Sequence, residues 1–188
     1  PLIAMVGRLT NQKGLDLVDC VLSDIMAENV QLAVLGMGDA RYTNLFSWAE
    51  GQYKGRLAAR FAMDHQLAHK LYAAADFFLM PSLFEPCGLS QIFSMRYATV
   101  PIVRETGGLR DTVIPYNQYT ETGTGFSFAN YNAHEMKDAI VRAIAVYQDK
   151  DKWNRLVRQC MLQDFSWDHS AREYYSLYGQ ICGITVTK

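Results

Sequence analysis

The strongest constraint on the fold is the alternation of short apolar runs with longer amphipathic stretches. Six runs have the length and composition of buried strands, at residues 2–6, 31–35, 56–61, 76–80, 99–103 and 125–128. Several segments between or after them have helical apolar spacing, including 15–25, 65–75, 89–97 and 132–148. Strands separated by crossover helices predict a parallel sheet with helices on both faces. The expected fold class is a doubly wound, Rossmann-like α/β domain.

The character of the chain changes after residue 149. Two more amphipathic stretches, 152–163 and 167–182, follow without a strand. Ser166 is a candidate N-cap of the second stretch. We therefore divide the chain into a sheet domain at residues 1–150 and a helical extension at residues 151–188. The first residue, Pro1, lies directly before a strand, and this start favours a domain of a longer protein.

Composition argues against several classes of partner. The 188 residues are 49% hydrophobic and 20% charged, and the net charge is −1. Because there is no basic block, nucleic-acid binding is not predicted. The apolar runs are too short to span a membrane. Cys20, Cys87, Cys160 and Cys182 form no CxxC pair, so neither a metal site nor a disulfide framework is predicted, and the pattern is typical of a reducing compartment.

The loop after the first strand carries two cations. In doubly wound sheets ligands bind beyond the carboxyl ends of the strands, so Gly7, Arg8 and Lys13 lie at the predicted ligand edge. Gly7 permits a tight exit from the strand, and Thr10 or Asn11 is a candidate cap for the next helix. Two cations beside a helix N-terminus suit a diphosphate. Two solvated surface cations are the alternative.

The segment after the fourth strand combines a carboxylate with a predicted helix start. Glu85 precedes Pro86, which disfavours helical conformation at the carboxylate. The amides of Gly88, Leu89 and Ser90 open the next helix and are expected to point into the cleft. Sugar hydroxyls would pair with the carboxylate and phosphate oxygens with the amides. The alternative is a capping glutamate at an ordinary turn.

Two further loops contain glycine pairs. Gly36 and Gly38 follow the second strand, but they lack the full GxGxxG spacing of a dinucleotide site, so an ordinary turn is favoured. After the fifth strand, Thr106 can hydrogen-bond to a ligand, and Gly107 and Gly108 allow the backbone to approach one. A simple turn is the alternative for this loop.

Three motifs, in order and at matching spacing, resemble bacterial glycogen synthases and plant starch synthases. They are Gly-Arg-Leu-Thr-Asn-Gln-Lys-Gly at 7–14, Phe-Glu-Pro-Cys-Gly-Leu at 84–89 and Thr-Gly-Gly-Leu-Arg-Asp-Thr-Val at 106–113. The likeness covers nearly the whole chain, continuing through residues 67–72, 123–126 and 164–167. It implies the C-terminal domain of an ADP-glucose-dependent GT-B glycosyltransferase.

This resemblance implies retaining transfer of glucose from ADP-glucose to the non-reducing end of an α-1,4-glucan. It places Arg8 and Lys13 at the donor diphosphate and Glu85 at the glucose. Further donor contacts are implied for Gly7, His69, Cys87, Gly88, Leu89, Ser90, Thr106 and Gly107. Neither a metal nor another cofactor is implied, and the Asp-x-Asp at 149–151 is interpreted as a solvated turn between helices.

Two positions depart from related enzymes. Met63 stands where bacterial relatives tend to have a tyrosine against the adenine, and Phe93 where many other retaining GT-B enzymes have a second glutamate. A transferase that uses UDP-glucose and a non-catalytic nucleotide-binding module are the alternative functions. A bacterial cytoplasm or a plastid stroma is the expected location.

By the same resemblance, the acceptor contacts are expected to belong to an N-terminal domain outside these 188 residues. The isolated chain is therefore expected to be inactive. Its last predicted helix would reach that domain through Tyr174, Tyr175 and Tyr178, whose rings would then be partly exposed. Packing of these rings on their own domain is the alternative.

Overall fold

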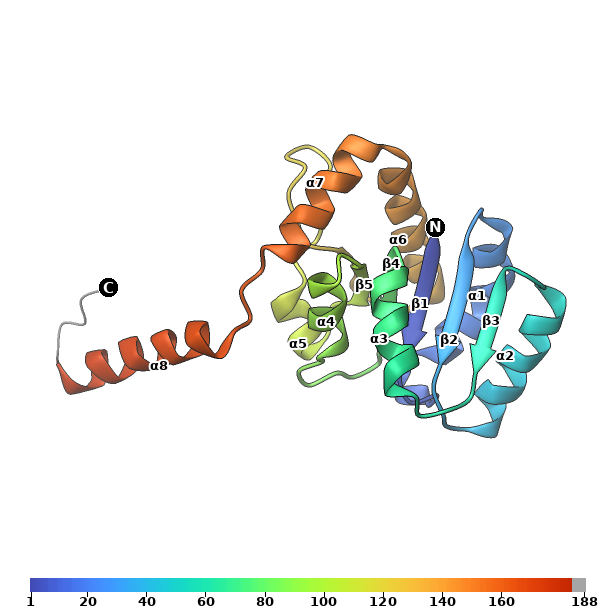
Figure 1. Ribbon diagram of the computed structural model, residues 1–188, viewed down its shortest axis with the longest axis horizontal. Coiled ribbons are helices and arrows are strands. Elements are labelled where there is room, and N and C mark those ends of the chain that lie inside the picture. Colours follow the sequence, from blue (N-terminus) through green and yellow to red (C-terminus); the bar gives the residue numbers. More distant parts are fainter. Residues whose placement is uncertain (184–188) are drawn as a thin grey trace.

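The computed structural model describes residues 1–183 and is built around a six-stranded parallel sheet (Figure 1). The strands are β1 (Leu2–Val6), β2 (Gln31–Leu35), β3 (Leu57–Arg60), β4 (Phe77–Met80), β5 (Val100–Arg104) and β6 (Phe126–Phe128). Their order is β3-β2-β1-β4-β5-β6. The predicted doubly wound α/β fold and its six strands are confirmed. The order reverses between β1 and β4, and such switch points are where these sheets bind ligands.

Helices cover both faces of the sheet and extend the chain beyond it. They are α1 (Leu15–Ala27), α2 (Ala40–Gln52), α3 (His65–Ala74), α4 (Ser90–Arg96), α5 (Gly107–Thr112), α6 (Ala133–Gln148), α7 (Lys150–Met161) and α8 (Trp167–Cys182). α2 was not predicted from the sequence, and the residues of α5 were expected to form a loop. Two glycines at the start of α5 lower its helix propensity, and burial of Leu109 against the sheet stabilises the helix in spite of them.

Two hydrophobic cores hold the helices to the sheet. Successive strand residues point to opposite faces, so Phe77 and Leu79 of β4 enter one core while Phe78 and Met80 enter the other. α1, α2 and α6 cover the first core, and α3 and α5 cover the second. Because both faces are covered, the strands are apolar along their whole length.

The two C-terminal helices differ in their packing. α7 contacts α4 and α6 and buries Trp153 and Leu156, whereas α8 extends away from the sheet (Figure 1). Ser166 caps α8 as predicted, accepting a hydrogen bond from the His169 amide at 3.2 Å. Asp149 lies in an exposed bend between α6 and α7, in agreement with the predicted solvated turn, and its carboxylate also caps α7 by accepting a hydrogen bond from the Lys152 amide at 3.2 Å. Residues 184–188 of the predicted extension lie outside the described residues.

The start of α6 gives a prediction about stability. Asn132 Oδ1 accepts hydrogen bonds from the amides of His134 at 2.9 Å and Glu135 at 3.1 Å. Asn132→Ala is expected to lower the free energy of unfolding by about 1 kcal/mol, because two amides lose their partner. Urea-induced unfolding measures the change. Asn154→Ala on the exposed side of α7 is the matched control, and an equal loss there would contradict the capping role.

Candidate functional site

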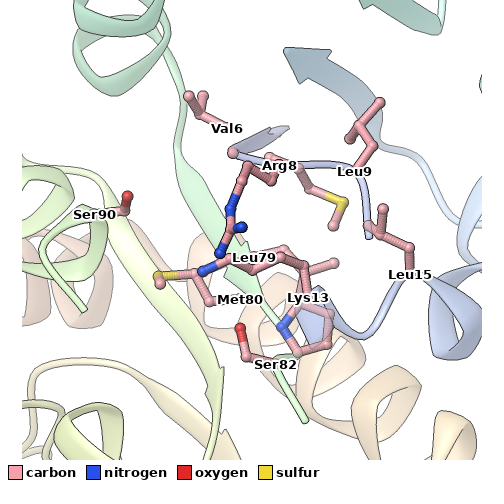
Figure 2. A pocket seen from close by; sticks show the side chains of 12 residues that line it. Val6, Arg8, Leu9, Lys13, Leu15, Leu79, Met80, Ser82 and Ser90 are labelled. Carbon is pink, nitrogen blue, oxygen red and sulfur yellow. The ribbon is translucent and has the colours of Figure 1, made fainter. Parts of the chain in front are cut away.

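The loops after β1 and β4 meet at the switch point and line a cavity of about 180 Å³ (Figure 2). Arg8 and Lys13 come from the segment after β1, Ser82 from the loop after β4, and Ser90 from the first residue of α4. Within residues 1–183 Arg8 has no ion-pair partner, so its charge is available to an anion. We call this space the cationic cavity. It brings together the two cations that the sequence placed on one loop.

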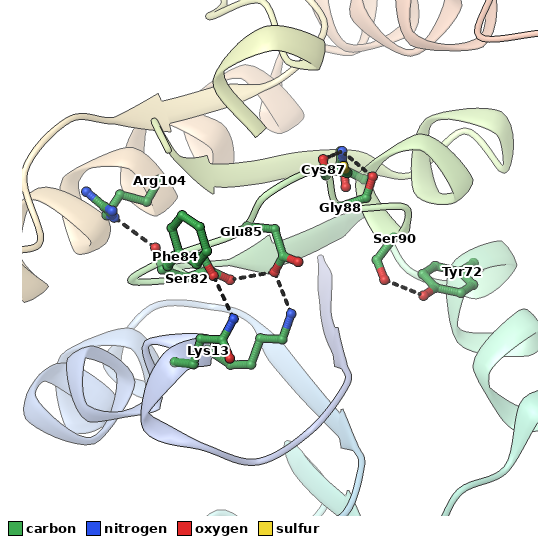
Figure 3. Close-up of polar contacts among 11 residues, drawn as sticks. Lys13, Tyr72, Ser82, Phe84, Glu85, Cys87, Gly88, Ser90 and Arg104 are labelled. Carbon is green, nitrogen blue, oxygen red and sulfur yellow. Dashed lines mark hydrogen bonds and ion pairs between the residues drawn. The ribbon is translucent and has the colours of Figure 1, made fainter. Parts of the chain in front are cut away.

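Glu85 does not itself line the cationic cavity, but it contacts two residues that do, Lys13 and Ser82. Its carboxylate oxygen Oε2 accepts hydrogen bonds from Lys13 Nζ at 2.5 Å and from Ser82 Oγ at 3.2 Å (Figure 3). The residue is only 9% exposed, and a carboxylate this buried is stable only when it is paired. The structure therefore joins Lys13 and Glu85, which the sequence analysis had assigned separately to diphosphate and sugar.

The segment that carries Glu85 is held by two side chains that the sequence analysis did not single out. Arg104, the last residue of β5, donates to the carbonyls of Ser82 at 2.8 Å and Leu83 at 2.5 Å. Gln12 donates to the Phe84 carbonyl at 3.1 Å. Both residues could have been found from the sequence, because each is a polar side chain at the carboxyl end of a predicted strand or in the segment that follows one. These bonds fix the backbone on which the carboxylate stands.

The glycines after β5 pack two loops together. A Cβ on Gly107 would lie 2.1 Å from the Glu85 carbonyl oxygen, and one on Gly108 would lie 2.0 Å from that of Cys87. The Gly108 amide also donates to the Pro86 carbonyl at 2.9 Å. Gly107 and Gly108 were expected to let the backbone approach a ligand. In the structure they are required for α5 to pack against the Glu85 segment.

The first two post-strand loops pack in a similar way. A Cβ on Gly36 would lie 1.8 Å from the Gly7 carbonyl oxygen, which confirms the structural role favoured for that loop. The predicted helix cap is wrong, because Gly14 takes the N-cap position of α1. Asn11 instead accepts a hydrogen bond from Tyr42 of α2, and within residues 1–183 the buried Thr10 hydroxyl has no partner.

A second cavity adjoins the first and is mostly apolar. It measures about 270 Å³ and shares Val6, Gly7 and Arg8 with the cationic cavity. Its outer wall includes Met37 and Met63, which are 53% and 81% exposed. We call it the apolar cavity. The two spaces meet at Arg8, an arrangement that suits a flat apolar group joined to an anion.

The remaining predicted site residues lie at the starts of α4 and α5 or outside the two cavities. Gly88, with a φ of 70°, leads into α4, whose start at Ser90 confirms the predicted helix. Cys87 and Leu89 are exposed beside it, and Thr106 takes the N-cap position of α5. His69 lies outside the lining of both cavities, in an aromatic group with Tyr72 and Tyr97.

Three further observations concern the described residues 1–183. All four cysteines are free, and burial raises the pKa of the Cys160 thiol to about 12. No group of three or more His, Cys, Asp and Glu side chains there is arranged to hold a metal ion. Nor does any helix in this part of the chain have the length and apolar character needed to cross a membrane.

Comparison with known proteins identifies the family. Residues 1–159 match the model of glycosyl transferases group 1. The chain belongs to this family. It is 57% identical over 178 residues to a glycogen synthase of Lachnoclostridium phytofermentans, an alignment that covers 94% of this chain and 37% of that protein. It is 50% identical to a glycogen synthase of Clostridioides difficile over 182 residues, covering 97% of this chain and 38% of the relative.

A solved structure gives the same result for this glycosyltransferase. The catalytic domain of starch synthase IV from Arabidopsis thaliana, bound to ADP and acarbose, superposes with a TM-score of 0.85. The two are 36% identical, and the match covers 96% of this chain and 38% of the other. The expected resemblance to glycogen and starch synthases and the expected GT-B type of fold are confirmed. The chain spans little more than a third of the length of these relatives.

Proposed function

We propose that this chain supplies the donor half of the active site of a glycogen or starch synthase. The whole enzyme would transfer glucose from ADP-glucose to the non-reducing end of an α-1,4-glucan, with retention of configuration. The observation that carries this proposal is that the cationic cavity and the apolar cavity meet at Arg8. The Lys13–Glu85 ion pair lies beside the cationic cavity. A nucleoside diphosphate sugar has the matching order of base, diphosphate and sugar.

The residue types suit the charges that develop during transfer. Cleavage of the anomeric C–O bond adds negative charge to the leaving diphosphate and positive charge to the sugar ring. Arg8 and Lys13 would stabilise the diphosphate, and preorganised charges of this kind are often the largest catalytic contribution. Glu85 would hold the glucose and favour the positive ring. The departing phosphate would take the proton of the acceptor hydroxyl, so Glu85 serves as a positioning and electrostatic group.

The apolar cavity is the proposed site of the base. Met37 and Met63 line it, and their polarizable sulfur atoms can pack against an adenine face. Gly7 borders both cavities, and a Cβ there would have no described atom within 4 Å, which leaves room for the ribose or diphosphate. The other proposed donor contacts rest on the family resemblance: His69, Cys87, Gly88, Leu89, Ser90, Thr106 and Gly107.

Ser90 gives a prediction about donor binding. Its Oγ accepts a hydrogen bond from the Tyr72 hydroxyl at 3.0 Å, and burial raises the pKa of Tyr72, which keeps that donor protonated. The Ser90 proton is thereby left to donate to a phosphate or sugar oxygen. Tyr72→Phe is expected to weaken ADP binding about threefold to tenfold, as measured by calorimetry. In a Ser90→Ala background the same change should have no effect, and additive losses would contradict this pairing.

The rest of the full-length enzyme would supply the acceptor site. The starch synthase neighbour was solved with ADP and acarbose, which supports a glucan acceptor beside the nucleotide. We propose that α8 reaches this remaining part of the protein, because Tyr174, Tyr175 and Tyr178 are each more than half exposed. Such a surface is normally covered by a partner. A bacterial cytoplasm is the proposed location, given the bacterial glycogen synthases to which the chain is similar.

Incorporation of labelled glucose by the full-length protein tests the proposal. ADP-glucose is expected to label glycogen or a maltooligosaccharide, and UDP-glucose is expected to label it more slowly. Faster incorporation from UDP-glucose would favour the alternative transferase. Binding of ADP without transfer from either donor would favour a non-catalytic nucleotide-binding module. The matched control is the same protein carrying Arg8→Ala, which removes the unpaired cation of the cationic cavity.

A further inference from the structure

A third cavity lies at the opposite edge of the sheet from the donor site. It measures about 610 Å³, within the roughly 300–1,000 Å³ range of ligand pockets. It lies beside the first residue of β6 and the last turns of α6, whereas the donor site lies beyond the carboxyl ends of the strands. We call it the Tyr119 cavity; its walls are Pro115, Tyr116, Asn117, Gln118, Tyr119, Phe126, Arg142, Ala145, Val146, Asp149 and Lys152.

One wall of the Tyr119 cavity belongs to the loop between α5 and β6, residues 113–125, and this loop is hydrogen-bonded to α7. Gln159 donates to the Glu121 carbonyl at 2.9 Å and accepts from the Gly123 amide at 3.0 Å. Arg155 forms an ion pair with the Glu121 carboxylate, and the Cys160 thiol donates to the Thr124 carbonyl. The amides of Tyr116 and Asn117 in turn donate to the carbonyls of Gly125 and Thr122, each at 2.8 Å, which ties the wall residues to this anchored segment. Little ordering would therefore be needed when a ligand binds.

The loop presents an aromatic ring to solvent. Tyr119 is 88% exposed, yet its amide donates at 2.9 Å to the Asn117 side chain, which fixes the turn that carries it. The half-buried Tyr116 lines the same space. Exposure of a tyrosine on a fixed loop gives a large contact area at low cost in conformational entropy.

The polar groups of the Tyr119 cavity suit a ligand rich in hydroxyl groups. Lys152 pairs with Asp149 at 3.3 Å, so their charges compensate. Arg142 uses one guanidinium nitrogen on the Ser127 carbonyl at 2.8 Å and has further N–H donors. Gln118 adds an amide that can both donate and accept. Aromatic rings beside planar hydrogen-bonding groups match the apolar faces and the hydroxyl rims of glucose units.

We propose that the Tyr119 cavity binds an α-glucan chain away from the reacting end. This inference rests on the proposed function, because a polymeric acceptor can occupy two distant sites at once. Holding one branch at the Tyr119 cavity would raise the effective concentration of other chain ends at the donor site. A short oligosaccharide cannot gain in this way, so the cavity acts on polymer alone.

Glycogen affinity of the full-length protein tests the proposal through two readouts. The first is retardation in native gels that contain glycogen, which does not depend on catalysis. The second is the KM for glycogen compared with that for maltotriose. Tyr119→Ala is expected to weaken retardation and raise the KM for glycogen roughly tenfold, without changing kcat or the KM for maltotriose. Tyr119→Phe, which keeps the ring, should retain most of the affinity.

Trp48→Ala, which removes an exposed aromatic from α2, is the matched control and should leave both readouts unchanged. Unchanged retardation of the Tyr119→Ala variant would overturn the inference. An equal rise in the KM for maltotriose would also overturn it, since the effect would then act through the donor site. If the wild-type protein elongates neither acceptor but is still retarded through Tyr119, the proposed function fails and the glucan site stands.

Discussion

Glu85→Gln in the full-length protein is expected to reduce kcat by roughly a hundredfold to a thousandfold. The substitution keeps the shape of the side chain and removes its charge, so the loss reports the electrostatic role at the sugar. Incorporation of labelled glucose into glycogen measures it. Glu50→Gln, which changes an exposed carboxylate on α2, is the control and should retain full activity. Wild-type turnover by the Glu85→Gln variant would refute the catalytic assignment.

The ion pair adds a second readout to this prediction. Lys13→Met leaves the buried Glu85 carboxylate without its cation, and we expect the free energy of unfolding to fall by about 1–3 kcal/mol. Glu85→Gln removes the charge that needs the partner. The double variant should therefore unfold less easily than Lys13→Met alone, although it is inactive. Strictly additive losses of stability would show that the two side chains do not form a pair in solution.

Gly108→Ala is expected to reduce transfer by about a hundredfold, the typical cost of displacing catalytic groups by 1 Å. The new Cβ would lie 2.0 Å from the Cys87 carbonyl oxygen and 2.6 Å from the Cys87 Cα. Both are backbone atoms, so the segment that carries Glu85 has to move. Steady-state kinetics of the full-length protein measures the loss.

Gly51→Ala in α2 is the control for this substitution. A Cβ there would have no described atom within 4 Å, and alanine favours a helix over glycine. The control should therefore be fully active and slightly more stable. If Gly108→Ala also retains full activity, tight packing of α5 on the Glu85 segment is not required for transfer.

Much of the fold followed from local pattern. Apolar runs of strand length alternate with helical periodicity, and this alternation predicted the parallel sheet and all six strands. α2 was not predicted from the sequence because only Tyr42, Phe46 and Ala49 are buried along its 13 residues, so its apolar stripe is weak. α5 was not predicted as a helix because its two glycines lower the local helix propensity, and only tertiary packing stabilises the helix.

The sequence by itself determined which residues carry charge at the ligand edge, since every post-strand loop of a parallel sheet reaches the same edge. Arg8, Lys13 and Glu85 were found in this way. Only the tertiary structure decided how they combine. β1 lies next to β4, and this brings Lys13 to Glu85 across 72 residues of sequence. Local periodicity contains no information on strand order, so the ion pair could be seen only after the chain had folded.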